Sequence, residues 1–148
     1  TVTPTGLVFG KGPGGPIAVT AALVSDPTKL RSANVTVAAL QGIGLTKGVG
    51  VVISSSGARG SGKLYRIFVP PGSTSLTVTL RGGTGDADIY VKRGTPPDNS
   101  GSNDACHSYN GGNNEDCVIA NPQSGTWYIL VDLWDPYANA TLTATYAP

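Results

Sequence analysis

Apolar and polar residues alternate with a period of two along several segments in the second half of this chain. In residues 76–80, two leucines and a valine occupy one side and two threonines the other. Because successive side chains of a strand point to opposite faces, such alternation predicts half-buried antiparallel strands. The apolar positions of three such segments are the candidate core residues: Leu76, Val78, Leu80, Ala87, Ile89, Val91, Trp127, Ile129, Val131 and Leu133.

Turn residues separate these segments at short intervals. Pro-Pro-Gly stands at residues 70–72, and Gly-Gly-Thr-Gly at residues 82–85, which we interpret as a tight hairpin connection. Pro136 separates residues 127–134 from a last alternating segment at residues 141–146. Several short strands at near-regular spacing predict an all-β fold, an antiparallel β-sandwich of the jelly-roll kind.

The first part of the chain is less regular. Residues 1–16 are rich in proline and glycine, which is typical of a tether. Residues 17–24 and 34–40 fit either a strand or an alanine-rich helix, and their valines and threonines favour strands. We therefore expect two parts: residues 1–42 as a linker or extra strands, and residues 43–148 as the sandwich domain.

Length and charge narrow the classes of partner. A chain of 148 residues is long enough for one domain with its own core. The formal net charge of +1 comes without a basic cluster, which removes the phosphate neutralisation on which nucleic-acid affinity depends. No apolar stretch approaches the roughly 20 residues that cross a bilayer, and the start at Thr1 is expected of a mature or excised fragment. We expect a monomer that binds neither nucleic acid nor membrane.

The two cysteines, Cys106 and Cys117, lie in a stretch rich in glycine and asparagine. Their spacing is too wide for a redox Cys-x-x-Cys pair, and they lack companion ligands for zinc. We expect a disulfide, which would constrain the unfolded chain by ~3 kcal/mol and suits a secreted, extracellular protein. Two buried free thiols are the alternative.

Motifs for hydrolytic chemistry are missing from the sequence. The single histidine, His107, cannot supply the two or three ligands that a zinc hydrolase needs, and no Gly-x-Ser-x-Gly elbow is present. The glycine run at residues 82–85 lacks the following helix and Lys-Ser/Thr pair of a phosphate-binding loop. The chain is therefore expected to be non-catalytic.

Acidic and amide side chains gather in three places that could hold a hard cation. These are Asp86 with Asp88, residues 113–116, and Asp132 with Asp135. Calcium takes about six to eight oxygen ligands, and loops rich in Asp and Asn supply them. Asp86 and Asp88 are the candidate metal ligands, with calcium as the possible cofactor. Turn capping by the same side chains is the alternative interpretation.

Aromatic residues on the polar strand faces are the candidate ligand-binding residues. Tyr90, Tyr128 and Trp134 belong to this set, together with Asp132. Tyrosine and tryptophan supply a large contact area at low entropic cost, so this face could dock onto a partner. Alternatively, Tyr128 and Trp134 pack beneath a covering loop such as residues 135–138.

A family resemblance rests on five features and on their order along the chain. They are residues 64–72, residues 76–80, residues 82–91, the two cysteines and residues 125–131. In that order they resemble the bacterial pre-peptidase C-terminal domain, a β-sandwich appended to secreted proteases. The resemblance covers roughly residues 43–146 and implies a secreted, non-catalytic accessory domain. The clostridial collagen-binding domains are similar in architecture, bind calcium, and use aromatic residues to grip the collagen triple helix.

The resemblance leaves three functions open. The first is binding of an insoluble, collagen-like protein substrate, or help with secretion, on behalf of the protease. The second is a calcium-dependent folding and stability domain that clamps the protease's own catalytic domain. The third is a carbohydrate-binding module, since such modules use aromatic platforms on similar sandwiches.

Overall fold

The computed structural model describes residues 14–23, 26–37 and 40–148 of the chain. Within these residues every regular element is a strand, so no helix there could cross a membrane. The strands are β1 Gly14–Leu23, β2 Asp26–Val37, β3 Ile43–Gly44, β4 Val51–Ser55, β5 Lys63–Val69, β6 Ser75–Arg81, β7 Thr84–Arg93, β8 Cys106–Ser108, β9 Glu115–Ala120 and β10 Gly125–Ala147.

The chain divides into two compact units, Thr1–Leu40 and Gln41–Pro148. In the first unit, β1 and β2 pair antiparallel, with Ile17 opposite Val35. Of the two structures that the sequence allowed for these segments, the strand is the one found. Most of the predicted tether, residues 1–13, lies outside the described residues.

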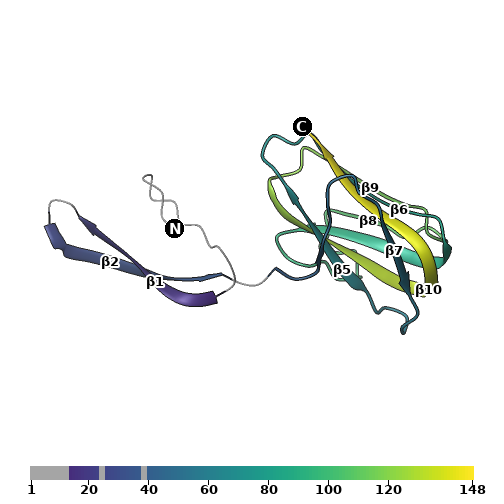
Figure 1. The fold of residues 1–148 in the computed structure, drawn as a ribbon, viewed down its shortest axis with the longest axis horizontal. Helices are drawn as coiled ribbons and strands as arrows, with labels where there is room; N and C mark the ends of the chain where they lie inside the picture. Colours follow the sequence, from purple (N-terminus) through teal and green to yellow (C-terminus); the bar gives the residue numbers. More distant parts are fainter. Residues whose placement is uncertain (1–13, 24–25, 38–39) are drawn as a thin grey trace. The chain divides into compact units, whose positions relative to one another are not determined.

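The second unit is a sandwich of two sheets that share β10 (Figure 1). The first half of β10 lies between β5 and β7, and β3 and β8 extend this front sheet on either side. The second half of β10 lies between β4 and β6, and β9 pairs with β6 to complete the back sheet. All these pairings are antiparallel except the short parallel pairing of β3 with β5. The predicted antiparallel β-sandwich is therefore confirmed.

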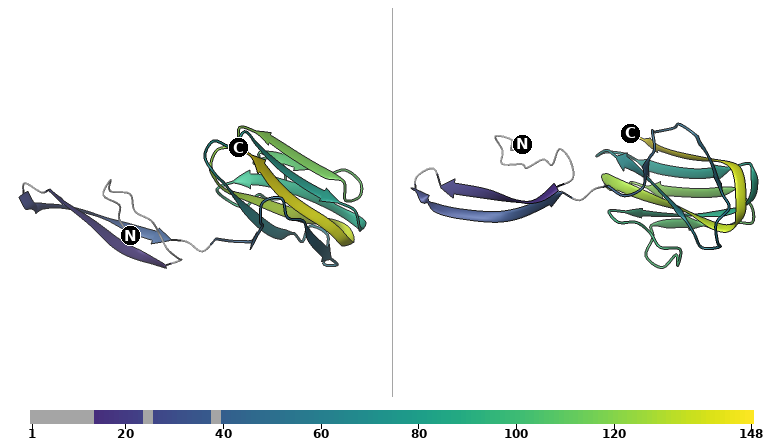
Figure 2. Two further views of the ribbon diagram at one scale, coloured as in Figure 1. Left: turned by 45° about the horizontal axis from the view of Figure 1, so that its top comes forward. Right: turned by 60° about the horizontal axis from the view of Figure 1, so that its bottom comes forward.

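Strand β10 is continuous where the sequence predicted two strands separated at Pro136. Its register shifts between Leu133 and Asp135 and again between Asp135 and Ala138. Such bulges bend a strand and increase its twist, and they tolerate a proline because an unpaired position needs no N–H donor. The bend carries β10 from the front sheet into the back sheet, as the turned views in Figure 2 show.

The glycine run at residues 82–85 lies against this bend. The predicted hairpin is wrong, because β6 and β7 belong to different sheets and the run carries the chain from one to the other. Gly85 has a φ of +87°, and a Cβ there would overlap the carbonyl oxygen of Pro136. Only glycine combines that backbone conformation with so close an approach.

Apolar side chains from both sheets fill the space between them. All of the candidate core residues from the sequence analysis are buried, with Trp127 the most exposed at 4%. Burial of each large aliphatic side chain contributes roughly 1.5–3 kcal/mol. The alternation in the sequence thus identified the inward face of β6, β7 and the first half of β10.

A disulfide joins Cys106 in β8 to Cys117 in β9, with 5.7 Å between their Cα atoms. It confirms the predicted pairing and links the edge of the front sheet to the edge of the back sheet. The chain between the two cysteines therefore has a fixed start and end, and this segment forms one wall of the site described next.

Candidate functional site

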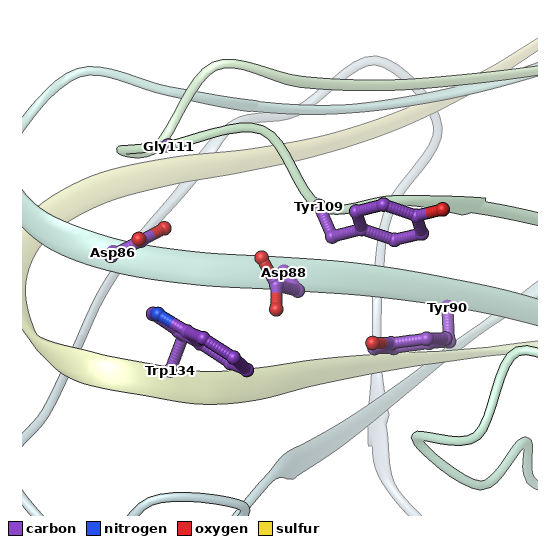
Figure 3. Close-up of a pocket in the computed structure, with 6 residues that line it drawn as sticks. All are labelled: Asp86, Asp88, Tyr90, Tyr109, Gly111 and Trp134. Carbon is purple, nitrogen blue, oxygen red and sulfur yellow. The ribbon is translucent and has the colours of Figure 1, made fainter.

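A pocket with a volume of about 320 Å³ opens on the outer face of the front sheet. Strand β7 supplies three lining residues, β10 supplies a tryptophan, and the segment between β8 and β9 supplies the opposite wall (Figure 3). The lining residues are Asp86, Asp88, Tyr90, Tyr109, Gly111 and Trp134.

The period of two in β7 places the pocket residues. Because Ala87, Ile89 and Val91 face the core, the intervening side chains point away from it. Trp134 comes from the bulge in β10 and has no register partner in β7, unlike its neighbours on either side. The bulge thus presents the indole ring, which is 52% exposed, beside the start of β7.

Asp88 is the most perturbed acidic group of the site. Its side chain is 5% exposed, and no group in the described residues donates a hydrogen bond to it. Burial, with the negative charges of Asp86, Glu115 and Asp132 as smaller causes, raises the pKa of Asp88 to about 6, while the charge of Arg59 opposes the rise. The floor of the pocket is therefore a carboxylate that lacks a strong partner.

The carboxylates around Asp88 are poorly compensated as well. Asp132 lies directly opposite Asp88 in the β7–β10 register, an unfavourable position for like charges. Its oxygens lie 3.5 Å from the side-chain nitrogen of Asn99, and Asp86 accepts a hydrogen bond of 3.1 Å from the Gly112 N–H. The ion pairs found in the described part of the chain, Arg81–Asp116 and Asp104–His107, involve none of the pocket acids.

Two exposed aromatic rings stand at the mouth of the pocket. The guanidinium carbon of Arg59 lies 3.1 Å from the centroid of the Trp134 ring, a cation–π contact. On the other wall, the Tyr109 ring stacks on His107 with 5.1 Å between centroids. Figure 3 shows the Asp88 carboxylate between the Trp134 and Tyr109 rings, with Tyr90 further along β7.

The sequence-predicted residues divide into two groups. Asp86, Asp88, Tyr90 and Trp134 converge on the pocket. Tyr128 and Asp132 do not line it, and Tyr128 is 6% exposed, in line with the alternative that it packs beneath a covering segment. Tyr90 is also largely buried, at 7%, and lines the pocket.

Loop segments contact the outward side chains that follow Tyr128 in β10. The backbone at Gly62 approaches so closely that a Cβ there would overlap the side chain of Leu130, and Asn99 reaches Asp132 from the segment after β7. These contacts come from the segments before β5 and after β7, and both lie across the outer face. The Arg59 guanidinium lies over the Trp134 ring, which stays 52% exposed, so the burial beneath residues 135–138 considered for Trp134 is not found.

Side chains of the acidic cluster at residues 113–116 form hydrogen bonds within the protein. Glu115 is fully buried and accepts hydrogen bonds from Ser108 and from the backbone and side chain of Asn110. Asn113 donates to the carbonyls of Gly82 and Thr84 at 3.0 and 3.1 Å. Turn and loop bonding, the alternative to a metal site, accounts for most of this cluster.

Calcium binding by Asp86 and Asp88 stays a prediction. In the described residues, no three His, Cys, Asp or Glu side chains are arranged to hold a metal ion. Two carboxylates alone supply too few oxygens for an ion that takes about six to eight. The pair as it stands does not fit a calcium centre built from acidic side chains.

Tyr109, Gly111 and Arg59 complete the site, and sequence reasoning missed all three. They lie in loops without periodicity, so alternation gave no signal for them. The position of Tyr109 between the two cysteines was the available indication, since the disulfide returns this segment to the sheet edge.

The model of the bacterial pre-peptidase C-terminal domain matches residues 61–133. An extracellular protease of Xanthomonas campestris pv. campestris is 42% identical over 98 residues, which are 66% of this chain and 16% of that protein. The chain spans 13% and 18% of the length of two further proteases that it matches, from Vibrio proteolyticus and Vibrio alginolyticus.

Two solved structures share the fold of the second unit. The solution structure of vEP C-ter 100 is 30% identical with a TM-score of 0.56, covering 71% of this chain and 100% of that one. The pre-peptidase C-terminal domain of collagenase from Bacillus anthracis is 15% identical with a TM-score of 0.52, covering 71% of this chain and 95% of that one. The second likeness concerns the fold alone.

Proposed function

Because the chain belongs to the bacterial pre-peptidase C-terminal domain family, we propose that it is an accessory domain that binds insoluble protein substrate for a secreted protease. The family is a non-catalytic domain of proteases, and the protease relatives match this chain over a small part of their length. The predicted extracellular location agrees with relatives that are extracellular proteases and is confirmed by them. The parent enzyme and its substrate belong to the proposal.

The pocket is the observation that carries the binding role. Exposed Trp134 and Tyr109 flank a hollow floored by Asp88, so the site combines contact area with hydrogen-bond acceptors. Aromatic anchors around a partly desolvated polar group are typical of sites where few residues supply most of the binding energy. On an insoluble substrate with many repeated sites, weak single contacts hold an enzyme close through effective concentration.

A pull-down on insoluble fibres tests the role. Collagen, elastin and keratin fibres are incubated with the 148-residue chain, and bound protein is measured after washing. Trp134→Ala is expected to lower the bound fraction several-fold. Phe68→Ala is the matched control, because Phe68 is an exposed aromatic on the same sheet, 61% exposed, outside the pocket. Equal binding by Trp134→Ala and the unmodified chain would overturn the substrate-binding role, and retention on cellulose or chitin alone would favour the carbohydrate-binding module.

The calcium-dependent stability domain is the second candidate. Two buried oxygens, Oδ1 of Asn113 and Oε1 of Glu115, lack hydrogen-bond partners, and oxygens of this kind are calcium ligands. A ligand that binds only the folded chain raises its melting temperature. A thermal melt with calcium and with a chelator therefore tests this candidate, and identical melting temperatures would rule it out.

A further inference from the structure

The pocket holds more negative charge than its own residues neutralise. The negative charges of Asp86, Glu115 and Asp132 act on Asp88, and Arg59 is the cation whose charge opposes them there. Arg59 makes no hydrogen bond to Asp88, which is 5% exposed and unpartnered in the described part of the chain. A carboxylate buried to this degree is stabilised by a cation that can also donate hydrogen bonds to it.

The walls of the pocket suit an organic cation. Ammonium and guanidinium groups are attracted to the faces of tryptophan and tyrosine rings, most strongly where water is excluded. Trp134 and Tyr109 flank the Asp88 carboxylate, and Tyr90 lies beside it (Figure 3). A cation that enters between the two exposed rings meets the carboxylate directly.

The chain itself already places a guanidinium on one of these rings. Arg59 lies over one face of the Trp134 ring, and its charge lowers the pKa of Asp88. Its side chain is exposed, and Trp134 remains 52% exposed beneath it. Arg59 thus shows that the ring accepts a planar cation, while the carboxylate keeps its hydrogen-bonding capacity free.

From these observations we infer that the pocket binds one basic side chain, a lysine or arginine, of a protein partner. The charged head would lie against the Asp88 carboxylate, and the aliphatic stem between the Trp134 and Tyr109 rings. The volume of about 320 Å³ accommodates one such side chain. This deepens the proposed function, on which it rests, because it names the chemistry by which an insoluble protein is recognised.

A titration with single amino-acid derivatives tests the inference directly. Nα-acetyl-lysine methylamide and Nα-acetyl-arginine methylamide are added to the 148-residue chain, and the indole N–H signal of Trp134 is followed by NMR. The expected result is saturable binding with a dissociation constant of about 1 mM. The uncharged analogues with norleucine and citrulline should bind at least about tenfold more weakly. Equal shifts with charged and uncharged derivatives would overturn the inference.

Two variants and a control locate the binding. Asp88→Asn should weaken binding of the charged derivatives by about tenfold, because it removes the charged acceptor. Arg59→Gln should strengthen binding about threefold, since it removes a competing cation. The control Asp116→Asn removes the same charge from the back sheet, where Asp116 pairs with Arg81, and should leave binding unchanged. Unchanged binding in Asp88→Asn would overturn the inference.

The two levels of the proposal fail in different ways. If Trp134→Ala releases the chain from fibres but no charged derivative binds the pocket, the basic-side-chain inference is wrong and the substrate-binding role stands. If the derivatives bind the pocket and the Trp134→Ala variant still binds the fibres, the basic-side-chain inference is supported and the substrate-binding role is wrong. Displacement of the lysine derivative by low-millimolar calcium, but not magnesium, would identify a metal site and overturn the inference.

Discussion

Ile89 and Asp88 lie on opposite faces of β7 and are buried to nearly the same extent, with opposite effects on stability. Ile89, on the inward face, is 0% exposed and packs among apolar neighbours. Asp88, on the outward face, is 5% exposed and lies among like charges. The first arrangement stabilises the fold through loss of apolar surface to water, and the second costs folding free energy through desolvation of a charge.

The difference teaches that burial on this strand serves two purposes. The inward face holds the two sheets together. The outward face carries acids, and one of them, Asp88, is buried without a hydrogen-bond donor among the described residues. A costly group in a concave site is a marker of function, and here it coincides with the pocket that the aromatic rings surround.

Ile89→Ala should produce the largest change in the free energy of unfolding, and it tests whether the inward face of β7 stabilises the fold. Removal of a fully buried isoleucine forfeits its transfer free energy and leaves a cavity, so the free energy of unfolding should fall by about 2–5 kcal/mol. Urea denaturation followed by fluorescence measures it. A loss below about 1 kcal/mol would mean that the inward face is less tightly packed than the structure shows.

Asp88→Asn should act in the opposite direction and depend on pH. The pKa of Asp88 rises from 3.8 to about 6 on folding, so the folded chain holds the proton more tightly and stability falls as pH rises through this window. At pH 7.5 the variant should be more stable than the unmodified chain by on the order of 1–2 kcal/mol, a figure reduced because the pocket is open to solvent. At pH 3.5 the two should be nearly equal.

Urea denaturation at both pH values tests this second prediction. The groups that face Asp88 are Asp86, Glu115, Asp132 and Arg59, and all are retained in the variant. A destabilised Asp88→Asn at pH 7.5 would mean that the carboxylate makes a favourable interaction in the folded chain, and the contrast between the two faces of β7 would then disappear.

Trp134→Ala should produce the smallest change in stability. The ring is 52% exposed and lies outside the core, so the free energy of unfolding should change by less than about 0.5 kcal/mol. Trp127→Ala, at 4% exposure in the same strand, should cost about 3–5 kcal/mol and serves as the internal comparison. Thermal melts of the two variants check it, and similar losses in both would assign Trp134 to the core.

The inward residues could be predicted from the sequence because alternation reports directly on which side of a strand a residue lies. The disulfide followed from the even pair of cysteines. Alternation cannot report how deeply the other side is covered, which is why the sequence left open whether Tyr128 is exposed or packs beneath a loop. Coverage depends on loops that return to the sheet from elsewhere in the chain.

The pocket was only half predictable for the same reason. Asp86, Asp88 and Tyr90 share one strand face and were found by their spacing. Arg59 and Tyr109 reach the site from loops before and after that strand, and no alternation marks either of them. The continuity of β10 past Pro136 was also hidden, since a proline normally ends a central strand and only the bulge makes it acceptable here.

The pairing of β10 in both sheets has a consequence for resistance to proteolysis. Proteases cleave chain that opens locally, so a domain lasts as long as its segments stay closed. Because β10 pairs with β5 and β7 along its first half and with β4 and β6 along its second, it cannot peel away without dismantling both sheets. Within Gln41–Pro148 cleavage is thus expected in the loops, and resistance to digestion follows the stability of the sandwich.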